Sequence, residues 1–166
     1  MVRKEKLAKT NAMRELERGG VAFEAQTYED DGSNATGYGV HVAEALGEDP
    51  DTAYKTLVTV APSGAHVVCC IPVAFELDLK KAAAAAGEKS LAMLPMKDLE
   101  ATTGYIRGGC SPVGMKRQFP TLIDETAQLF DQIGISGGRR GLSLRVDPLA
   151  LAAFVGATFA DITREM

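Results

Sequence analysis

Lys55 is the residue of this 166-residue chain whose type and position most suggest chemistry. It is the only Lys or Arg between Arg18 and Lys80, and it lies where a predicted strand enters the apolar run 57–58. A lysine in such a place is partly desolvated and can donate hydrogen bonds to an anion or a polarised carbonyl. The alternative is a surface lysine whose aliphatic stem covers apolar neighbours while its ammonium stays in water.

Two glycine pairs with basic neighbours form a second group of candidates. Gly108-Gly109 follows Arg107, and Gly137-Gly138 precedes Arg139-Arg140. Glycine tolerates positive φ and leaves backbone N–H groups exposed, so such a loop can donate to an ester carbonyl or a ribose, and the arginines can hold phosphates. A tight connection that simply requires glycine is the alternative for each pair.

The sequence offers few residues for other common kinds of catalytic or metal-binding site. Neither His41 nor His66 lies beside a G-x-S-x-G segment, and both are expected at the surface. Neither glycine pair continues into the Gly-Lys-Ser/Thr of a phosphate-binding P-loop. Three cysteines, of which Cys69 and Cys70 are adjacent, make neither a disulfide framework nor a zinc site. The sequence therefore implies no metal and no cofactor, and reduced thiols fit a cytoplasmic location.

Charge and hydropathy restrict the partners. The formal net charge of -4 argues against DNA or any general affinity for nucleic acid, because phosphate binding is carried by Lys and Arg. Residues 104–145 nevertheless hold six Lys or Arg against three Asp or Glu. This segment could bind one phosphate chain, although an ordinary mixed surface gives the same count. No apolar run is long enough for a secretion signal or a membrane span, so we expect no membrane partner.

Hydrophobic periodicity predicts the elements that position these residues. Strands are expected at 21–28, 53–60, 66–73, 90–94, 120–124, 129–135 and 142–146, and helices at 40–46, 77–86, 96–102 and 148–155. A further short helix is expected near the start, capped by Thr10 or Asn11 and ended by Gly19-Gly20. Tyr28 ends the first strand on its polar face, either as a site residue or as a half-buried core tyrosine. We expect one α+β domain over residues 10–166, with a flexible segment 1–9 before it. Its sheet should be mixed and mainly antiparallel, or a partly open barrel, with surrounding helices and a central hairpin of 53–60 and 66–73.

Four segments, taken in order, resemble the YbaK/EbsC family of stand-alone aminoacyl-tRNA deacylases, which are related to the editing domain of bacterial prolyl-tRNA synthetase. They are Tyr28 before an acidic loop, residues 54–57, residues 103–114 and residues 135–142. Each is weak alone, but the ordered set is specific, and the likeness covers nearly the whole chain.

The resemblance implies hydrolytic clearance of Cys-tRNA(Pro), which forms when prolyl-tRNA synthetase mistakes cysteine for proline. Two small side chains differ too little in binding energy for one site to separate them well, so a second sieve is useful. In the implied mechanism the substrate's own thiol attacks its ester carbonyl and releases tRNA with a cyclic thioester. The protein then mainly orients the ester and stabilises charge. Mischarged tRNA and prolyl-tRNA synthetase are the implied partners.

The same resemblance assigns roles to individual residues. Those implied in catalysis are Lys55, Gly108 and Gly109, and those implied in substrate binding are Tyr28, Thr56, Pro112, Ser136, Ser143 and Arg139. Two positions depart from the family pattern: some relatives carry Asp in place of Ser143, and Cys110 replaces an aliphatic residue. Because no histidine is near it in sequence, we interpret Cys110 as a small buried residue rather than a nucleophile.

Two alternative functions remain open. The substrate could be another mischarged tRNA, carrying alanine or serine, which has no thiol to cyclise. The domain could also be a non-catalytic module that binds tRNA or a synthetase, although Lys55 and the Gly108-to-Pro112 motif count against this. The net charge implies weak tRNA binding through residues 107–145, with tRNA identity read by the partner synthetase.

Overall fold

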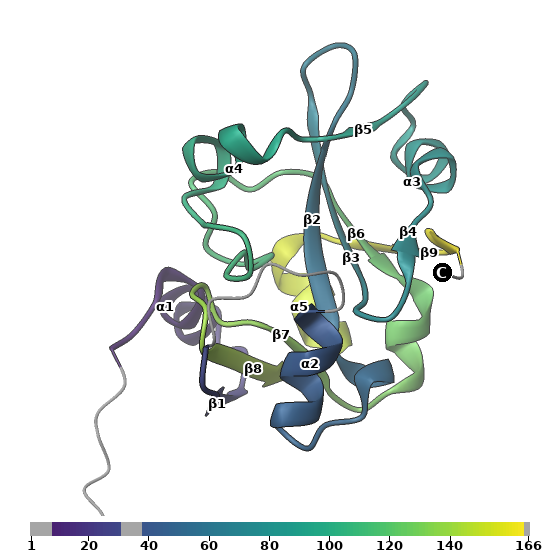
Figure 1. The fold of residues 1–166 in the computed structure, drawn as a ribbon. Coiled ribbons are helices and arrows are strands. Elements are labelled where there is room, and N and C mark those ends of the chain that lie inside the picture. Colours follow the sequence, from purple (N-terminus) through teal and green to yellow (C-terminus); the bar gives the residue numbers. More distant parts are fainter. Residues whose placement is uncertain (1–7, 31–37, 165–166) are drawn as a thin grey trace, which may run out of the picture.

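The computed structural model describes residues 8–30 and 38–164, and a long β-hairpin runs through the middle of the molecule (Figure 1). The helices are α1 (Asn11–Arg18), α2 (Tyr38–Ala45), α3 (Leu79–Ala86), α4 (Met96–Thr103) and α5 (Pro148–Val155), with 3-10 turns η1 (Pro50–Thr52) and η2 (Glu125–Leu129). The strands are β1 (Phe23–Thr27), β2 (Tyr54–Val60), β3 (His66–Pro72), β4 (Glu76–Leu77), β5 (Ala92–Met93), β6 (Thr121–Asp124), β7 (Ile133–Ser136), β8 (Leu142–Val146), β9 (Thr158–Ala160) and β10 (Thr163–Arg164).

Most strands belong to two sheets. The larger has the order β5-β2-β3-β6-β9, in which β2 and β3 form an antiparallel hairpin and β6 and β9 add in parallel. The smaller is antiparallel, with the order β1-β8-β7. In the described residues an isolated parallel bridge between Ala53 and Gly134 joins the two sheets, and the strands form no closed barrel. The predicted α+β class with a mixed, mainly antiparallel sheet is confirmed.

The β2–β3 hairpin occupies the centre of the larger sheet, as predicted. β3 is buried from Val67 to Pro72, which fits its unbroken run of apolar and thiol side chains. The helix α3 covers one face of this sheet through Ala82 and Ala83, which pack with Ile71 and Leu77. The side chain of Asp78 caps α3 by accepting hydrogen bonds from its first backbone N–H groups.

The main core lies where the smaller sheet, the hairpin and the helices α1 and α5 meet. Leu16, Ile123, Ile135, Leu144 and Leu151 are each at most 1% exposed in this cluster. Burying each such side chain contributes about 1.5–3 kcal/mol. The core therefore fixes the smaller sheet against the hairpin, and with it the loops that leave both.

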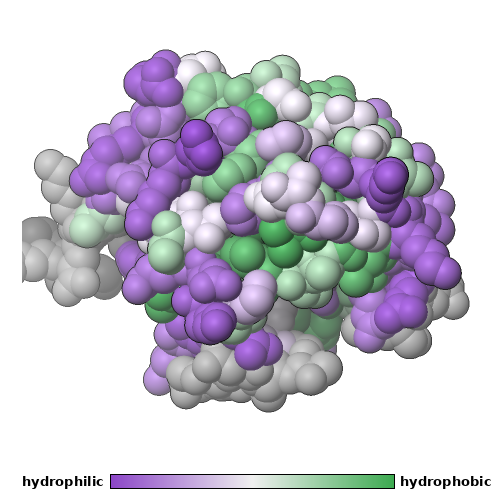
Figure 2. Space-filling view, turned by 90° about the horizontal axis from the view of Figure 1, so that it is seen from above, coloured by the Kyte–Doolittle hydropathy of each residue, from purple (hydrophilic) through white to green (hydrophobic). Residues whose placement is uncertain are grey.

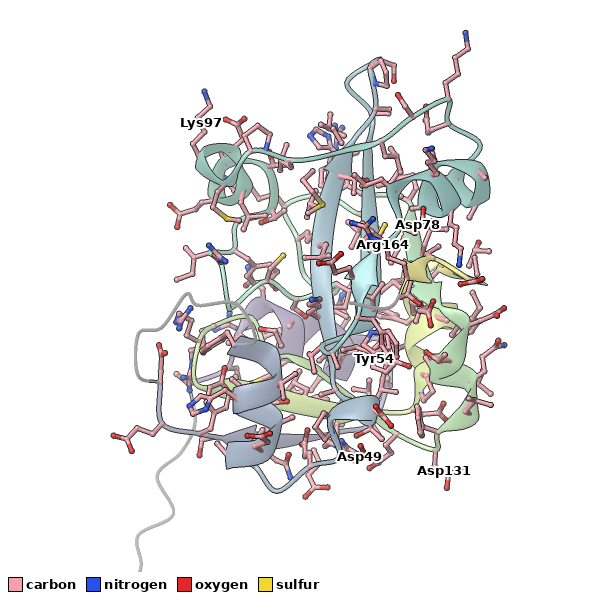
Figure 3. The ribbon with its side chains drawn as sticks, turned by 45° about the vertical axis from the view of Figure 1, so that its right-hand side comes forward. Asp49, Tyr54, Asp78, Lys97, Asp131 and Arg164 are labelled. Atoms are coloured by element: carbon pink, nitrogen blue, oxygen red, sulfur yellow. The ribbon has the colours of Figure 1, made fainter. Side chains whose placement is uncertain are left out.

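A buried polar chain crosses the same region. The carboxylate of Asp124, 1% exposed, accepts hydrogen bonds from the Ile162 N–H at 3.1 Å and the Thr126 hydroxyl at 2.6 Å. The hydroxyls of Thr126 and Tyr54 are 2.7 Å apart, and Tyr54 lies in the interior at the lower part of β2 (Figure 3). Burial raises the pKa of Tyr54 to about 12, so this tyrosine is a neutral structural group.

Several boundaries differ from the sequence predictions. The strand expected at 129–135 is only Ile133–Ser136, because the Asp124 side chain accepts the Thr126 N–H and starts the turn η2 instead. The helix expected at 40–46 is Tyr38–Ala45. β9 was not predicted, since three residues show no periodicity, yet it extends the larger sheet beside β6. Most of the segment 1–9 and most of the predicted acidic loop lie outside the described residues. Within the described ranges no helix is long and apolar enough to cross a membrane.

Candidate functional site

A cavity of about 460 Å³ opens between α2, the lower part of β2, α4 and the two glycine-containing loops. This volume suits a small organic ligand. Met93 and Met96, which are 44% and 55% exposed, lie at its rim. The face seen from above in Figure 2 is hydrophobic near its middle and hydrophilic along both sides. Most of the residues that line the cavity are apolar, and a few charged or hydroxyl side chains, among them Glu48, Lys55 and Ser136, interrupt this apolar surface.

Lys55, on β2 of the larger sheet, borders the cavity. β5 pairs only with Thr59 and Val60, and the bridge to β7 is formed by Ala53, so within the described residues Lys55 itself pairs only with Ile71 of β3. Burial lowers the pKa of Lys55, although the carboxylate of Glu76 acts in the opposite direction. Among the described residues its ammonium forms no hydrogen bond or ion pair. Lys55 is thus a partly desolvated cation with its donors unused, which can stabilise negative charge on a ligand.

Next to α2, a cluster of aromatic and charged side chains borders the cavity. The hydroxyls of Tyr28 and Tyr38 are 3.3 Å apart, and the Arg140 guanidinium lies 4.3 Å from the centre of the Tyr38 ring. Arg140 Nε donates to both carboxylate oxygens of Asp30 at 3.0 Å, and the arginine side chain is only 12% exposed. Burial raises the pKa of Tyr38, and the hydrogen bond to Tyr28 adds to this. The cluster fixes the end of β1, the start of α2 and the second glycine loop relative to one another.

The first glycine loop packs tightly against the second. Gly108 has a φ of +83°, and a Cβ there would lie 2.3 Å from Arg140 Nη1. Nη1 also donates to the Arg107 carbonyl at 3.3 Å. A Cβ at Gly109 would meet the backbone of Arg139 at 2.9 Å, so Gly109 requires glycine for this close approach, whereas position 108 favours glycine because of its positive φ.

Only one amide of this glycine pair has its N–H available. The Gly109 N–H donates to the Ile106 carbonyl at 3.0 Å and closes a turn. Among the described residues the Gly108 N–H has no partner, and Gly108 borders the cavity. If this loop holds an oxyanion or a ribose by a backbone donor, Gly108 is therefore the donor that the geometry leaves open.

Two serines line the cavity from paired positions on β7 and β8. Ser136 and Ser143 are opposite each other in the antiparallel ladder. The Ser143 hydroxyl, in a residue that is 8% exposed, donates to the Ile135 carbonyl at 3.3 Å. The Ser136 hydroxyl accepts the Gly138 N–H at 3.2 Å and so shapes the second glycine loop. Both hydroxyls are held by backbone bonds that limit their rotation.

The structure brings most of the predicted site residues together. Those that line the cavity are Tyr28, Lys55, Thr56, Gly108, Ser136 and Ser143. Pro112 is buried and Arg139 is exposed, and neither lines the cavity, whereas Arg140, next to Arg139 in the chain, borders it directly. Sequence reasoning gave no site role to Tyr38 or Glu48, because neither stands in a motif. Sequence periodicity also cannot tell which of the adjacent residues Arg139 and Arg140 borders the cavity, because both lie in a turn.

The thiols near the cavity are not activated. Cys110 lines it but is 7% exposed, and burial raises its pKa to about 12. Burial raises the pKa of Cys70 to about 12 as well. At neutral pH both remain thiols, which are poor nucleophiles. Within the described residues no group of three or more His, Cys, Asp or Glu side chains is arranged to hold a metal ion.

Comparison with known proteins places this fold and site in a family. Residues 36–154 match the family described as "Aminoacyl-tRNA editing domain". EbsC of Enterococcus faecalis, named for Cys-tRNA(Pro)/Cys-tRNA(Cys) deacylase activity, is 47% identical over 163 residues, which are 98% of this chain and 98% of that protein. The chain belongs to the aminoacyl-tRNA editing domain family, so the predicted relationship is confirmed.

Solved structures agree with this assignment. A crystal structure described as a trans-editing enzyme for prolyl tRNA synthetase is 25% identical, with a TM-score of 0.79 over 93% of this chain and 95% of that one. The crystal structure of hypothetical protein APE2540 has a TM-score of 0.83 at 21% identity, covering 93% and 100% of the two chains. The second likeness concerns the fold alone.

Proposed function

We propose that this chain is a trans-editing deacylase that removes cysteine from mischarged Cys-tRNA(Pro). The observation that carries the proposal is the convergence of Lys55, Gly108 and Ser136 on one cavity, in a family whose common activity is aminoacyl-tRNA editing. The name of the E. faecalis relative supports the substrate. The enzyme would act in the cytoplasm, where charged tRNA is found.

The cavity fits a reaction in which the substrate supplies the nucleophile. The cysteinyl thiol loses its proton and attacks the ester carbonyl carbon, so a C–S bond forms while the C–O bond to the ribose breaks. The ribose oxygen takes up a proton, which balances the one lost by the thiol. The protein needs only to align the two groups and stabilise the oxyanion, which suits a site whose own thiols are neutral.

Each residue role follows from its place. Lys55 stabilises the developing oxyanion, because its ammonium is partly desolvated and otherwise unused. Gly108 lies against the terminal ribose and ester and offers its free N–H. Tyr28, Thr56 and Ser136 shape the pocket for the aminoacyl group. Prolyl-tRNA synthetase is the proposed partner that delivers the tRNA, in line with the description of one structural neighbour.

A deacylation assay with Cys-tRNA(Pro), Ala-tRNA(Pro) and Ser-tRNA tests the proposal. We expect turnover of the cysteinyl ester and little of the others, because only cysteine carries a thiol that can cyclise. Lys55→Ala should lower turnover by about a hundredfold, in the range found for loss of an oxyanion donor. Lys80→Ala, which removes an exposed lysine of α3, is the matched control. Rapid release of alanine or serine would change the substrate, and binding without turnover of any ester would leave a tRNA-binding module.

A further inference from the structure

The cavity contains one buried carboxylate that the proposed mechanism does not use. The side chain of Glu48 is 8% exposed, and Glu48 is the only acidic residue among the described residues that line the cavity. Its Oε2 lies 3.4 Å from Arg145 Nη1. Its Oε1 is buried and has no hydrogen-bond partner within the described ranges. A buried carboxylate oxygen without a donor is costly, so such an atom in a residue that lines a cavity points to a missing ligand group.

The surrounding backbone holds this carboxylate in place. The Glu48 N–H donates to the Ala43 carbonyl at 2.9 Å, which ties the residue to the end of α2. A Cβ at Gly134 would lie only 3.1 Å from Glu48 Oε2, so the glycine of β7 leaves the space that the carboxylate occupies. Gly134 is also opposite Arg145 in the β7–β8 ladder. The position of Glu48 is therefore built by three elements.

Arg145 compensates the negative charge of Glu48 but gives no hydrogen bond to its Oε1 atom. The same Nη1 atom donates to the Thr52 hydroxyl at 3.2 Å, and it reaches only one of the two carboxylate oxygens. Burial raises the pKa of Glu48, while Arg145 opposes this shift. The unoccupied oxygen remains an acceptor that a donor of positive charge would satisfy best.

We propose that Glu48 Oε1 binds the α-ammonium group of the aminoacyl ester. This inference rests on the proposed function, since the α-ammonium is the cationic group that a mischarged 3′ end brings into the cavity. Lys55 is itself a cation and cannot accept that group, and the serine hydroxyls, each with one hydrogen bond to backbone, are neutral and therefore weaker acceptors for an ammonium than a carboxylate. Glu48 is a positioning residue: it anchors the amine of the substrate while Lys55 and Gly108 act on the ester.

This role defines the class of ester that the enzyme accepts. A free α-amine is required, whatever the amino-acid side chain. Esters whose nitrogen is acylated, such as peptidyl-tRNA, carry a neutral amide at the same place. They would leave the carboxylate desolvated and unpaired, so the enzyme should reject them.

Binding of two stable analogues tests the inference. The probes are 3′-cysteinylamino-3′-deoxyadenosine and its 3-mercaptopropanoyl counterpart, which lacks only the amine. Calorimetry should show that the unmodified protein prefers the amine by roughly tenfold to a hundredfold, as expected for one charge-assisted hydrogen bond. In Glu48→Gln this preference should fall below about threefold, through weaker binding of the cysteinyl analogue alone. Glu44→Gln, at an exposed position of α2, should behave like the unmodified protein.

The possible results of this experiment distinguish the role of Glu48 from the proposed deacylase function on which it rests. Equal binding of both analogues by a protein that deacylates Cys-tRNA(Pro) would overturn the role of Glu48 and leave the function intact. An equal loss for both analogues in Glu48→Gln would also overturn it, because a merely structural ion pair does not distinguish the two. If the protein neither binds the analogues nor turns over Cys-tRNA(Pro), both proposals fail. Should Glu48→Gln not fold, Glu48→Asp retains the charge of the pair but withdraws it by one methylene, and the preference should still decrease.

Discussion

Lys55 carries a protonation equilibrium that the proposed chemistry depends on. Burial lowers its pKa because a desolvated ammonium is less stable than the neutral amine. As pH rises through this lowered pKa, the charge that stabilises the oxyanion is lost. Between the lowered pKa and the ordinary one the unfolded chain binds more protons, so the free energy of unfolding increases with pH over the same interval. A loss of turnover over this pH interval is therefore not caused by unfolding linked to the titration of Lys55.

The first prediction is therefore an alkaline decrease in turnover whose midpoint lies below the ordinary lysine pKa of about 10.4. Turnover first rises with pH as the substrate thiol ionises, then falls as Lys55 loses its proton. In Lys55→Arg the cation persists, so turnover should be lower at neutral pH but show no alkaline decrease. Single-turnover rates, corrected for spontaneous ester hydrolysis, measure both profiles. The same decrease in both proteins would assign it to another group.

Cys110 gives a second prediction at the scale of a residue. Its raised pKa of about 12 keeps the thiol neutral, so it cannot serve as the nucleophile. Cys110→Ala should retain turnover of Cys-tRNA(Pro) within about threefold and lose about 1 kcal/mol of stability from the small cavity. Steady-state deacylation and urea unfolding give the two values. A loss of turnover by more than an order of magnitude in a natively folded variant would restore Cys110 as a catalytic candidate.

At the scale of elements, the two glycine loops act as one unit, and this gives the third prediction. Gly108→Ala introduces both a positive φ for alanine and a contact 2.3 Å from Arg140 Nη1. Gly87→Ala, at the C-cap of α3, has a φ of +73° but no heavy atom within 4 Å, so it isolates the cost of the backbone conformation. We expect a loss of about 1–2 kcal/mol for Gly87→Ala and of about 2–4 kcal/mol for Gly108→Ala.

Turnover distinguishes the two variants more sharply. Displacing Arg140 loosens its hydrogen bonds to Asp30 and to the Arg107 carbonyl, so Gly108→Ala should also lose at least about tenfold in activity. Gly87→Ala lies outside the cavity and should keep its activity. Urea unfolding and single-turnover deacylation report the two quantities. Equal stability and equal activity for both variants would contradict the contact between the loops.

How far the sequence predicts these elements depends on the range of the interactions that form them. α1 and α5 follow from local signals, namely a cap at Thr10 or Asn11, the cap at Asp147, and the glycines that end both helices. The alanine run and Gly87 predict α3, but it begins at Leu79 after the cap Asp78 and not at residue 77. β9 could not be predicted, because its three residues become a strand only beside β6. The same difference applies to the site. Lys55 and Gly108 stand in local motifs, whereas Glu48 is placed beside the cavity by tertiary contacts, namely its ion pair with Arg145 and the space left by Gly134.

For the whole molecule, the net charge of -4 sets how tRNA can bind. The exposed cations nearest the cavity are few. Arg107 lines it, Arg139 adjoins Arg140, and Lys97 extends outward from α4 next to Met96 (Figure 3). Each phosphate contact releases counterions and steepens the salt dependence of binding. Three contacts would give a slope of roughly -2 to -3 in a plot of log affinity against log salt concentration.

We therefore predict a shallow salt dependence that arises at these positions alone. Lys97→Glu and Arg107→Glu should each raise the KM for Cys-tRNA(Pro) and reduce the salt slope by about 1. Neither should change the affinity for the cysteinyl-adenosine analogue, which has no phosphate. Lys80→Glu, on α3 and outside the lining of the cavity, should alter neither quantity, although it changes the net charge equally. A slope near -6, or an equal effect of Lys80→Glu, would mean that tRNA contacts a much wider surface than the mouth of the cavity. A shallow slope would mean that this protein contacts few phosphates and that a partner binds most of the tRNA. Adding prolyl-tRNA synthetase should then lower the KM for Cys-tRNA(Pro) without changing the single-turnover rate.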